Sequence, residues 1–255
     1  IKTLLRHEVW GSALAHLLVT GVVGAVLIYW TAGQSWGAAV VMALALGFSS
    51  TVLAAKVLEG NRELRSVHGR VAIGILIVQD IVAVVLLAVV SVETPSPYAL
   101  GLLLLPLARP LIAKLLDYCG HGELLVLCGA GLALGGGELF AQAGLSAELG
   151  ALLLGAMLAD HRRGQELTDV LWGLQELFLV GFFLNIGLSG LPSWETLTTA
   201  LWLLLFLPLQ GVLFFLLLIA SGLRARTSFL TAVSLTTYSE FALIVADVEV
   251  TNHFV

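Results

Sequence analysis

Long apolar runs, separated by short polar or Gly/Pro-containing connections, follow one another along the whole chain. Because a helix needs about 20 apolar residues to cross the hydrocarbon core of a bilayer, such runs predict membrane-spanning helices. The sequence therefore predicts an all-α polytopic membrane protein. Its hydrophobic segments lie at residues 9–30, 37–57, 70–92, 98–116, 123–141, 144–160, 170–189, 194–221 and 227–248.

Two of these segments fit a simple crossing helix poorly. Residues 98–107 are few for a crossing, and Pro106 and Pro110 would bend or end a helix there. Residues 145–159 are also few, although a tilted or partly re-entrant helix could accommodate them. We therefore expect irregularity at both places.

Composition supports a membrane domain and argues against several classes of function. Of 255 residues, 59% are hydrophobic and 11% are charged, far more apolar than a soluble domain of this length requires. The two cysteines, Cys119 and Cys128, provide neither a disulfide framework nor a metal-binding cluster, and the sequence lacks a His-Glu-x-x-His zinc motif. We expect no enzyme activity, no cofactor and no nucleic-acid partner.

The basic residues indicate the orientation of the chain in the membrane. If the segments alternate in direction, all 12 Lys and Arg residues fall on one face, and the opposite connections at 31–36, 93–97, 141–145 and 190–194 carry none. The positive-inside rule makes the basic face cytoplasmic. We expect a multi-pass membrane protein. The basic residues are Lys2, Arg6, Lys56, Arg62, Arg65, Arg70, Arg109, Lys114, Arg162, Arg163, Arg224 and Arg226.

Asp80 is the most informative single residue. It lies near the middle of the apolar run 71–92, directly after Gln79. A carboxylate at the centre of a membrane helix costs about 2.5–3.5 kcal/mol on insertion scales, so it persists only where it faces a polar cavity or has partners. The sequence favours an ion or proton site, and the alternative is a structural carboxylate held by a buried hydrogen bond.

Two segments carry hydroxyl-rich stretches about half-way across the membrane. They are Gly-Phe-Ser-Ser-Thr at 47–51 and Thr-Thr-Tyr-Ser-Glu at 236–240. Transporters interrupt helices at corresponding places in two inverted halves, so that helix ends point at the transported ion. Serine and threonine can instead bond back to an unbroken helix. Because the two stretches accompany Asp80, we predict two interrupted helices.

Two more polar residues occur in apolar surroundings. Glu240 suits a structural role at a helix N-terminus, where a carboxylate balances the helix dipole, better than a role as a second cation ligand. Gln210 lies in mid-span next to Pro208, and a hydrogen bond between two helices is its simplest interpretation.

Six stretches, in order along the chain, resemble the monovalent cation:proton antiporter-2 family, notably its Kef-type potassium/proton members. The resemblance implies a sodium/proton-antiporter-like fold with inverted repeats, two interrupted crossing helices and a dimer-forming scaffold. The stretches are GFSSTVLAA at 47–55, HGR at 68–70, VQDI at 78–81, GLSAELGALLLG at 144–155, LVGFFLNIGL at 179–188 and YSEFA at 238–242.

The resemblance also implies roles for individual residues. Asp80 would be the carboxylate that binds the transported monovalent cation or the proton, with Gln79 as its companion. Ser49, Ser50 and Thr51 would belong to the first interrupted helix, and Ser239 and Glu240 to the second. Relatives usually begin with further helices and, in Kef-type members, end with a cytoplasmic nucleotide-binding regulatory domain. We expect residues 1–255 to be an incomplete transmembrane exchanger domain, without the regulatory domain, of a homodimeric protein.

One departure from the family pattern concerns Gln210. Many relatives place a lysine in the corresponding span, where its ammonium group would pair with the site carboxylate. With Gln210 in its place, Asp80 loses a candidate counter-ion. This favours electroneutral exchange, or impaired function, over electrogenic exchange.

Together, the residues and the resemblance predict exchange of a monovalent cation, K⁺ more than Na⁺, for H⁺ by alternating access at Asp80. A cation channel that uses the same acid, or a non-transporting membrane scaffold, are the alternatives. An intramembrane protease is weaker, because no histidine is convincingly placed for Ser49 or Ser50. The sequence does not fix ion selectivity, since selectivity depends on cavity size and ligand geometry.

Overall fold

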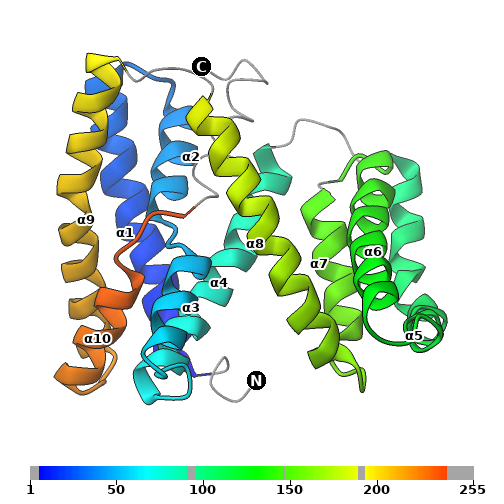
Figure 1. The fold of residues 1–255 in the computed structure, drawn as a ribbon. Helices are drawn as coiled ribbons and strands as arrows, with labels where there is room; N and C mark the ends of the chain where they lie inside the picture. The colour runs from blue at the N-terminus through cyan, green and yellow to red at the C-terminus, as the bar shows by residue number, and fades with distance from the viewer. Residues whose placement is uncertain (1–5, 91–95, 146, 189–192, 240–255) are drawn as a thin grey trace. The chain divides into compact units, whose positions relative to one another are not determined.

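The computed structural model describes residues 6–90, 96–145, 147–188 and 193–239. Within these ranges all regular structure is helical, which confirms the predicted all-α membrane fold. The chain divides into two compact units, each drawn in Figure 1. Unit 1 takes its residues from 1–90 and 194–255, and unit 2 from 91–193.

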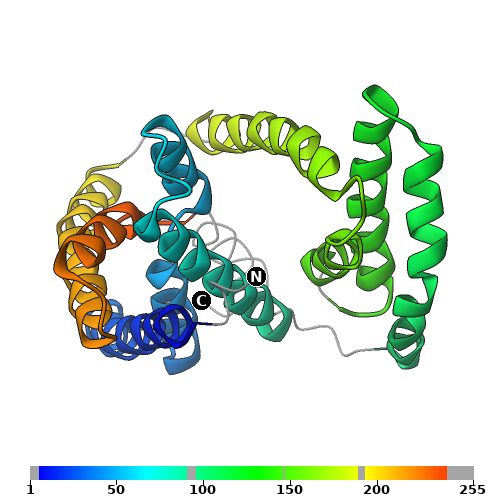
Figure 2. The ribbon, with the colours of Figure 1, turned by 90° about the horizontal axis from the view of Figure 1, so that it is seen from below.

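Unit 1 is a bundle of helices from both ends of the chain. Helix α1 packs against α2, α4 and α9, while α10 packs against α9, α4 and α3. Figure 2 views this bundle nearly end-on. Its main core joins Leu58, Ile75, Phe214 and Leu235, from four different helices. The helices are α1 (His7–Ala32), α2 (Trp36–Gly47), α3 (Thr51–Gly60), α4 (Val67–Val90), α9 (Trp194–Ala220) and α10 (Ala225–Leu235).

Unit 2 contains the middle of the chain. Helices α6 and α7 pack closely, because Gly150 lies directly against the backbone carbonyl of Gly136 and leaves no room for a side chain. Leu116, Leu125 and Leu158 belong to its buried core. The elements are the 3₁₀ helix η1 (Pro97–Ala108), α5 (Arg109–Tyr118), α6 (Glu123–Gln142), α7 (Ala147–Leu158) and α8 (Gly164–Leu188).

Six stretches in the described ranges are long and apolar enough to cross a membrane, and each coincides with a predicted span. This agreement confirms a multi-pass membrane protein. The stretches are His7–Ala32, Trp36–Gly60, Val67–Leu86, Glu123–Gln142, Gly164–Asn185 and Leu197–Ala220.

The remaining three predicted spans take other forms. Residues 98–116 do not form one helix: η1 contains Pro106 and ends at Ala108, and α5 starts anew with Pro110 in its first turn. Proline lacks the amide hydrogen that would continue a helix, which explains the change. Helix α7 has only 12 residues. Helix α10 ends at Leu235, and residues 240–248 of the ninth segment lie outside the described ranges.

Basic residues gather at one end of each unit. In unit 1 the start of α1, the α3–α4 connection and the α9–α10 connection lie at the same end (Figure 1). In unit 2, α5 and the α7–α8 connection lie at one end, and the α6–α7 connection, without Lys or Arg, lies at the other. Each unit therefore agrees with the alternating arrangement predicted from the sequence.

Candidate ion-binding site

The second membrane span is interrupted in its middle. Helix α2 ends at Gly47 and α3 begins at Thr51, with extended backbone at Phe48 (φ −76°, ψ 142°) and Ser50 (φ −73°, ψ 116°). Ser50 is the N-cap of α3, and its hydroxyl oxygen accepts a hydrogen bond from the backbone N–H of Leu53 at 3.3 Å. The first predicted interruption is therefore confirmed.

Two glutamine side chains bond the backbone that the interruption exposes. Gln79 Oε1 accepts from the N–H of Ser49 at 3.1 Å, and Gln79 Nε2 donates to the carbonyl of Gly47 at 3.4 Å. Gln210 Nε2 donates to the carbonyl of Leu46 at 2.9 Å. Inside a bilayer every backbone polar group needs a partner in the protein. These glutamines therefore stabilise an interruption that would otherwise be strongly unfavourable.

The second hydroxyl-rich stretch lies against this interruption. Helix α10 ends at Leu235, and the chain continues without helix to Ser239. The N–H of Ser50 donates to Thr237 Oγ1 at 3.0 Å, and the N–H of Ser239 donates to the carbonyl of Phe48 at 3.1 Å. The two non-helical stretches thus hold each other through direct hydrogen bonds.

Whether a helix resumes after residue 239 lies outside the described residues, so the second predicted interruption stays a prediction. Glu240 lies outside the described residues, so its proposed dipole-balancing role stays a prediction. Ser239 is buried at the contact with the first interruption. The contribution of Thr237 was not singled out from the sequence, although this residue stands within the predicted polar stretch.

Glycines let neighbouring helices approach both non-helical stretches closely. A side chain at Gly47 would come within 2.6 Å of Thr20 Oγ1 on α1, and one at Gly211 within 2.5 Å of Thr236 Oγ1. Tyr238 adds a hydrogen bond from its hydroxyl to the carbonyl of Leu203 at 2.6 Å. The end of α10 is therefore fixed against α9.

Asp80 lies on α4 beside the start of α3, and its side chain is partly accessible. The hydroxyl of Thr51, the first residue of α3, lies 3.3 Å from Asp80 Oδ1 and 3.2 Å from Oδ2 and donates to the carboxylate. The positive end of a helix dipole favours negative charge at this position. The first turn of α3 therefore gives the carboxylate a favourable location within an apolar segment.

The Ser49 hydroxyl makes no hydrogen bond at the interruption among the described residues. The Ser49 side chain is buried, with 1% exposed. A buried hydroxyl without a partner costs about 1–3 kcal/mol. Whereas the hydroxyls of Ser50 and Thr51 already make hydrogen bonds, the Ser49 hydroxyl can act as an oxygen ligand.

The described residues of unit 1 also contain unpaired polar atoms at Gln210, beside a cavity, and at the buried His16. A cavity of about 620 Å³ between α1, α2 and α9 reaches Gln210, whose Oε1 has no partner among the described residues. His16 is fully buried and its ring stacks on Phe214 with centroids 3.6 Å apart. The cavity walls are mainly apolar and do not suit an ion path. The described residues also contain no group of three or more His, Cys, Asp or Glu side chains arranged for a metal.

The structure gathers the predicted site residues of the described ranges in unit 1. Gln79, Ser49 and Ser50 meet at the first interruption, Thr51 joins Asp80 to it, and Gln210 and Ser239 contact it from α9 and from the stretch after α10. The arrangement provides one carboxylate beside the N-terminus of α3, and the interruption itself carries the Ser49 hydroxyl, which is unpaired within the described ranges.

Comparison with known proteins agrees with this arrangement. A family described as "Sodium/hydrogen exchanger, transmembrane" matches residues 5–254. The K(+) efflux antiporter 1, chloroplastic, of Arabidopsis thaliana is 30% identical over 219 residues, which covers 74% of this chain and 18% of the relative. The glutathione-regulated potassium-efflux system protein KefC of Salmonella typhi is 28% identical over 263 residues, which covers 94% of this chain and 42% of the relative.

The chain thus spans less than half the length of either relative. Both relatives carry the names of transport proteins rather than of enzymes. The match along nearly the whole chain confirms the Kef-type resemblance of its motifs, and the chain belongs to the sodium/hydrogen exchanger transmembrane family.

Proposed function

We propose that this chain is the transmembrane part of a secondary transporter that exchanges a monovalent cation for H⁺ at Asp80. The observation that carries the proposal is the position of the Asp80 carboxylate, on α4, beside the interruption between α2 and α3. Glutamine side chains from α4 and α9 already bond the backbone at this interruption. K⁺ is favoured over Na⁺, because the relatives are named as potassium-efflux proteins.

One carboxylate can couple the two ions because it holds either a proton or a cation. The hydroxyl of Thr51 suits both states, since it donates to the ionised carboxylate and can turn to accept from the protonated acid. The Ser49 hydroxyl and the oxygens of Asp80 would supply ligands for the dehydrated cation. Binding of one ion then excludes the other, and this competition links their movements.

Gln79 acts in this proposal mainly as a positioning residue. Both of its amide atoms bond the backbone of the interruption, at Ser49 and Gly47. It therefore keeps the start of α3, and with it Thr51, at a fixed place beside the carboxylate.

Gln210 supports electroneutral exchange. Its side-chain nitrogen is engaged by the Leu46 carbonyl, and it carries no charge that could neutralise Asp80. The Asp80 site then contains one carboxylate and no ammonium group from position 210. Because a proton and a monovalent cation carry the same charge, exchanging one for the other leaves the charge of the site unchanged.

Transport by this site requires access from alternating sides of the membrane. We infer that one helical bundle moves relative to the rest, in a longer homodimeric protein of a bacterial inner membrane. Residues 1–255 would be its exchanger domain.

The deciding experiment is cation-dependent proton flux in proteoliposomes that contain the full-length protein. Asp80→Asn should reduce the flux to the level of protein-free liposomes, because an amide neither ionises nor carries the exchanged proton. Asp169→Asn changes an exposed aspartate of α8 and should leave the flux unchanged. Both variants should elute and unfold like the wild type. Exchange retained by Asp80→Asn would defeat the assignment.

The same liposomes separate an exchanger from a channel. An outward K⁺ gradient should drive H⁺ uphill through an exchanger when the membrane potential is clamped at zero. A channel would let K⁺ pass without moving H⁺ against its gradient, and a scaffold would move neither ion. Parallel runs in potassium, sodium and choline salts define selectivity.

A further inference from the structure

Unit 2 contains a cavity lined partly by charged side chains, which the exchange mechanism does not use. It has a volume of about 430 Å³ and lies between α5 and the end of α7 with the connection that follows it. Its charged walls are formed by Arg109 and Asp117 of α5 and by Asp160 and Arg162 beyond α7. Two guanidinium groups and two carboxylates therefore face one small volume.

The two guanidinium groups of the cavity retain donors for a further partner. Arg109 is fixed by a hydrogen bond from Nε to the carbonyl of Met157 at 3.1 Å, and its Nη2 lies 3.8 Å from Asp160 Oδ2. Arg162 Nη2 lies 3.7 Å from Asp117 Oδ1. Both ion pairs are longer than a hydrogen bond. The side chains are 54% and 81% exposed, so an incoming group can reach them.

The carboxylates of the cavity differ in how strongly the protein holds them. Asp117 has three cationic or donor neighbours, because His161 Nε2 lies at 3.6 Å and Arg163 Nε at 3.9 Å in addition to Arg162. Arg163 is itself anchored by the carbonyls of Leu116 and Gly120. Asp160 has its long contact with Arg109, and its side chain is 77% exposed.

His161 contributes no charge in its neutral form. Its Nδ1 accepts a hydrogen bond from the N–H of Arg163 at 3.2 Å, which assigns the ring proton to Nε2. The lining groups then carry two positive and two negative charges. A purely anionic ligand would meet both carboxylates, and a purely cationic ligand both guanidinium groups. A zwitterion of similar span fits this arrangement better than either.

We propose that this cavity binds the phosphoethanolamine headgroup of a membrane lipid. Arg109 and Arg162 bind the phosphate, because guanidinium groups match phosphate oxygens in geometry and charge. Asp160 accepts the three-donor ammonium group. A phosphocholine headgroup lacks these N–H donors, and a phosphoglycerol headgroup lacks the positive charge, so both fit less well.

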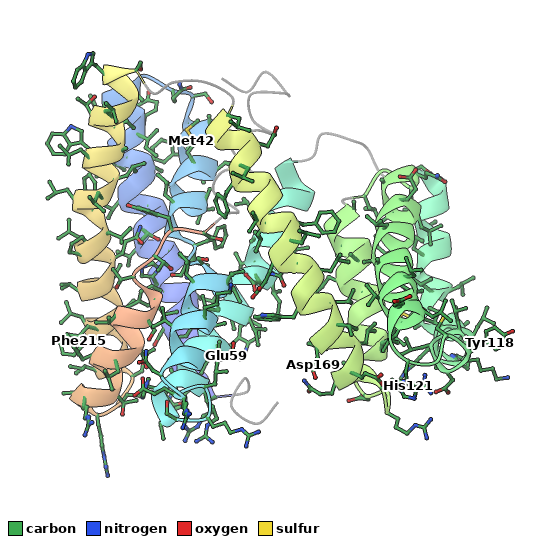
Figure 3. The ribbon with its side chains drawn as sticks, in the orientation of Figure 1. Met42, Glu59, Tyr118, His121, Asp169 and Phe215 are labelled. Atoms are coloured by element: carbon green, nitrogen blue, oxygen red, sulfur yellow. The ribbon has the colours of Figure 1, made fainter. Side chains whose placement is uncertain are left out.

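The surroundings of the cavity favour a lipid as the source of this group. Besides its charged groups, the cavity is lined by Pro110, Ala113, Met157 and Leu158, which offer an apolar surface to the start of the acyl chains. Lys114 is also exposed on α5, and Figure 3 shows Tyr118, His121 and Asp169 at this end of unit 2. Basic and aromatic residues of this kind mark the headgroup level of a membrane.

The proposal is tested by native mass spectrometry of the delipidated full-length protein with equimolar phosphatidylethanolamine, phosphatidylglycerol and phosphatidylcholine. The wild type should retain phosphatidylethanolamine preferentially. The double variant Arg109→Gln/Arg162→Gln should lose about tenfold in this retention for each guanidinium group removed, about a hundredfold in all. Asp160→Asn should shift the preference to phosphatidylglycerol. Glu138→Gln, which neutralises an exposed carboxylate of α6 outside the cavity lining, is the control and should leave the headgroup preference unchanged.

Three results would overturn the proposal. One is a wild type without preference for phosphatidylethanolamine, and another is unchanged headgroup selectivity in Asp160→Asn. The third is displacement of the lipid by an equal concentration of soluble O-phosphoethanolamine, which would assign the cavity to a soluble ligand. If the double variant does not fold, the selectivity of Asp160→Asn decides alone, because this substitution alters an exposed side chain.

Discussion

The two units place their polar side chains differently. In unit 1, Gln79, Gln210 and Thr237 bond backbone groups at the interruption in the middle of a membrane span. In unit 2, α6 runs without interruption from Glu123 to Gln142, and the ion pairs of Asp117 and of Glu166 lie near helix ends.

This difference follows from the backbone. A continuous helix bonds its own amides and carbonyls, so its polar side chains are not needed within the membrane. An interrupted helix leaves groups without partners, and side chains from other helices must bond them. The same local opening admits a carboxylate beside a helix N-terminus. The two units should therefore respond differently to substitution.

The largest difference is expected for Gln79→Leu. This change leaves the Ser49 N–H and the Gly47 carbonyl buried without their partner, at about 1–3 kcal/mol each, so we expect a loss of about 2–6 kcal/mol in unfolding free energy. Transport should also disappear. Denaturant unfolding and proton flux measure the two effects. Gln165→Leu, at an exposed glutamine of α8, is the control, and equal stability of both variants would contradict the role of Gln79.

A packing change in unit 2 should affect stability without affecting the ion site. Gly150→Ala brings a methyl group against the Gly136 carbonyl and the Phe140 ring, which should cost about 1–3 kcal/mol. Gly155→Ala, in the same helix but with open space around it, should be neutral or stabilising by up to about 1 kcal/mol. Thermal unfolding compares the pair. If the folded Gly150→Ala variant has a changed apparent cation affinity, packing within unit 2 influences the ion site in unit 1, and the expectation is wrong.

Thr51 tests the contact between the interruption and the carboxylate. Thr51→Val keeps the shape but removes the hydroxyl that donates to Asp80, and we expect apparent cation affinity to change by about tenfold. Thr51→Ser should keep most of the wild-type affinity. Concentration dependence of proton flux gives the values. Thr31→Val, which removes an exposed hydroxyl bonded to the Leu27 carbonyl, should have no effect. Equal affinities for Thr51→Val and Thr51→Ser would exclude the hydroxyl from the site.

The smallest change is expected for Gln210→Lys. An ammonium group can still donate to the Leu46 carbonyl, so the fold should be preserved, but a second titratable charge enters the region of the site. Exchange should then depend on membrane potential, whereas the wild type should not. Flux measured at several imposed potentials distinguishes them. Gln210→Leu is the uncharged control. If all three proteins show the same voltage dependence, residue 210 does not influence the net charge moved in each transport cycle.

Several parts of the fold could be predicted from local sequence. In the described ranges, five of the six apolar stretches form continuous helices of membrane length, and the sixth is divided into α2 and α3 at the polar residues 47–51. The segment 98–116 is predicted as one span whose prolines bend or end its helix, and the structure divides it there into η1 and α5. Apolar length alone predicts a helix, whereas backbone geometry at proline decides whether the helix continues.

The hydrogen bonds between the site residues could not be predicted from local sequence. The role of Gln79 as companion of a cation-binding carboxylate stays a prediction, whereas its hydrogen bond to the backbone of Ser49, 30 residues away in sequence, is visible only in the structure. Ser50 bonds Thr237, which is 187 residues away. Nothing in either local pattern specifies its distant partner.

The sequence by itself therefore determined the membrane character, the approximate spans, the one-sided basic residues and the unusual acid at Asp80. These properties depend on hydrophobicity and charge within one segment, which sequence displays directly. Only the tertiary structure decided that two glutamines complete the interrupted backbone and that the two non-helical stretches bond each other. Such contacts depend on how distant helices pack, because a hydrogen bond requires its two atoms at about 3 Å in a suitable direction.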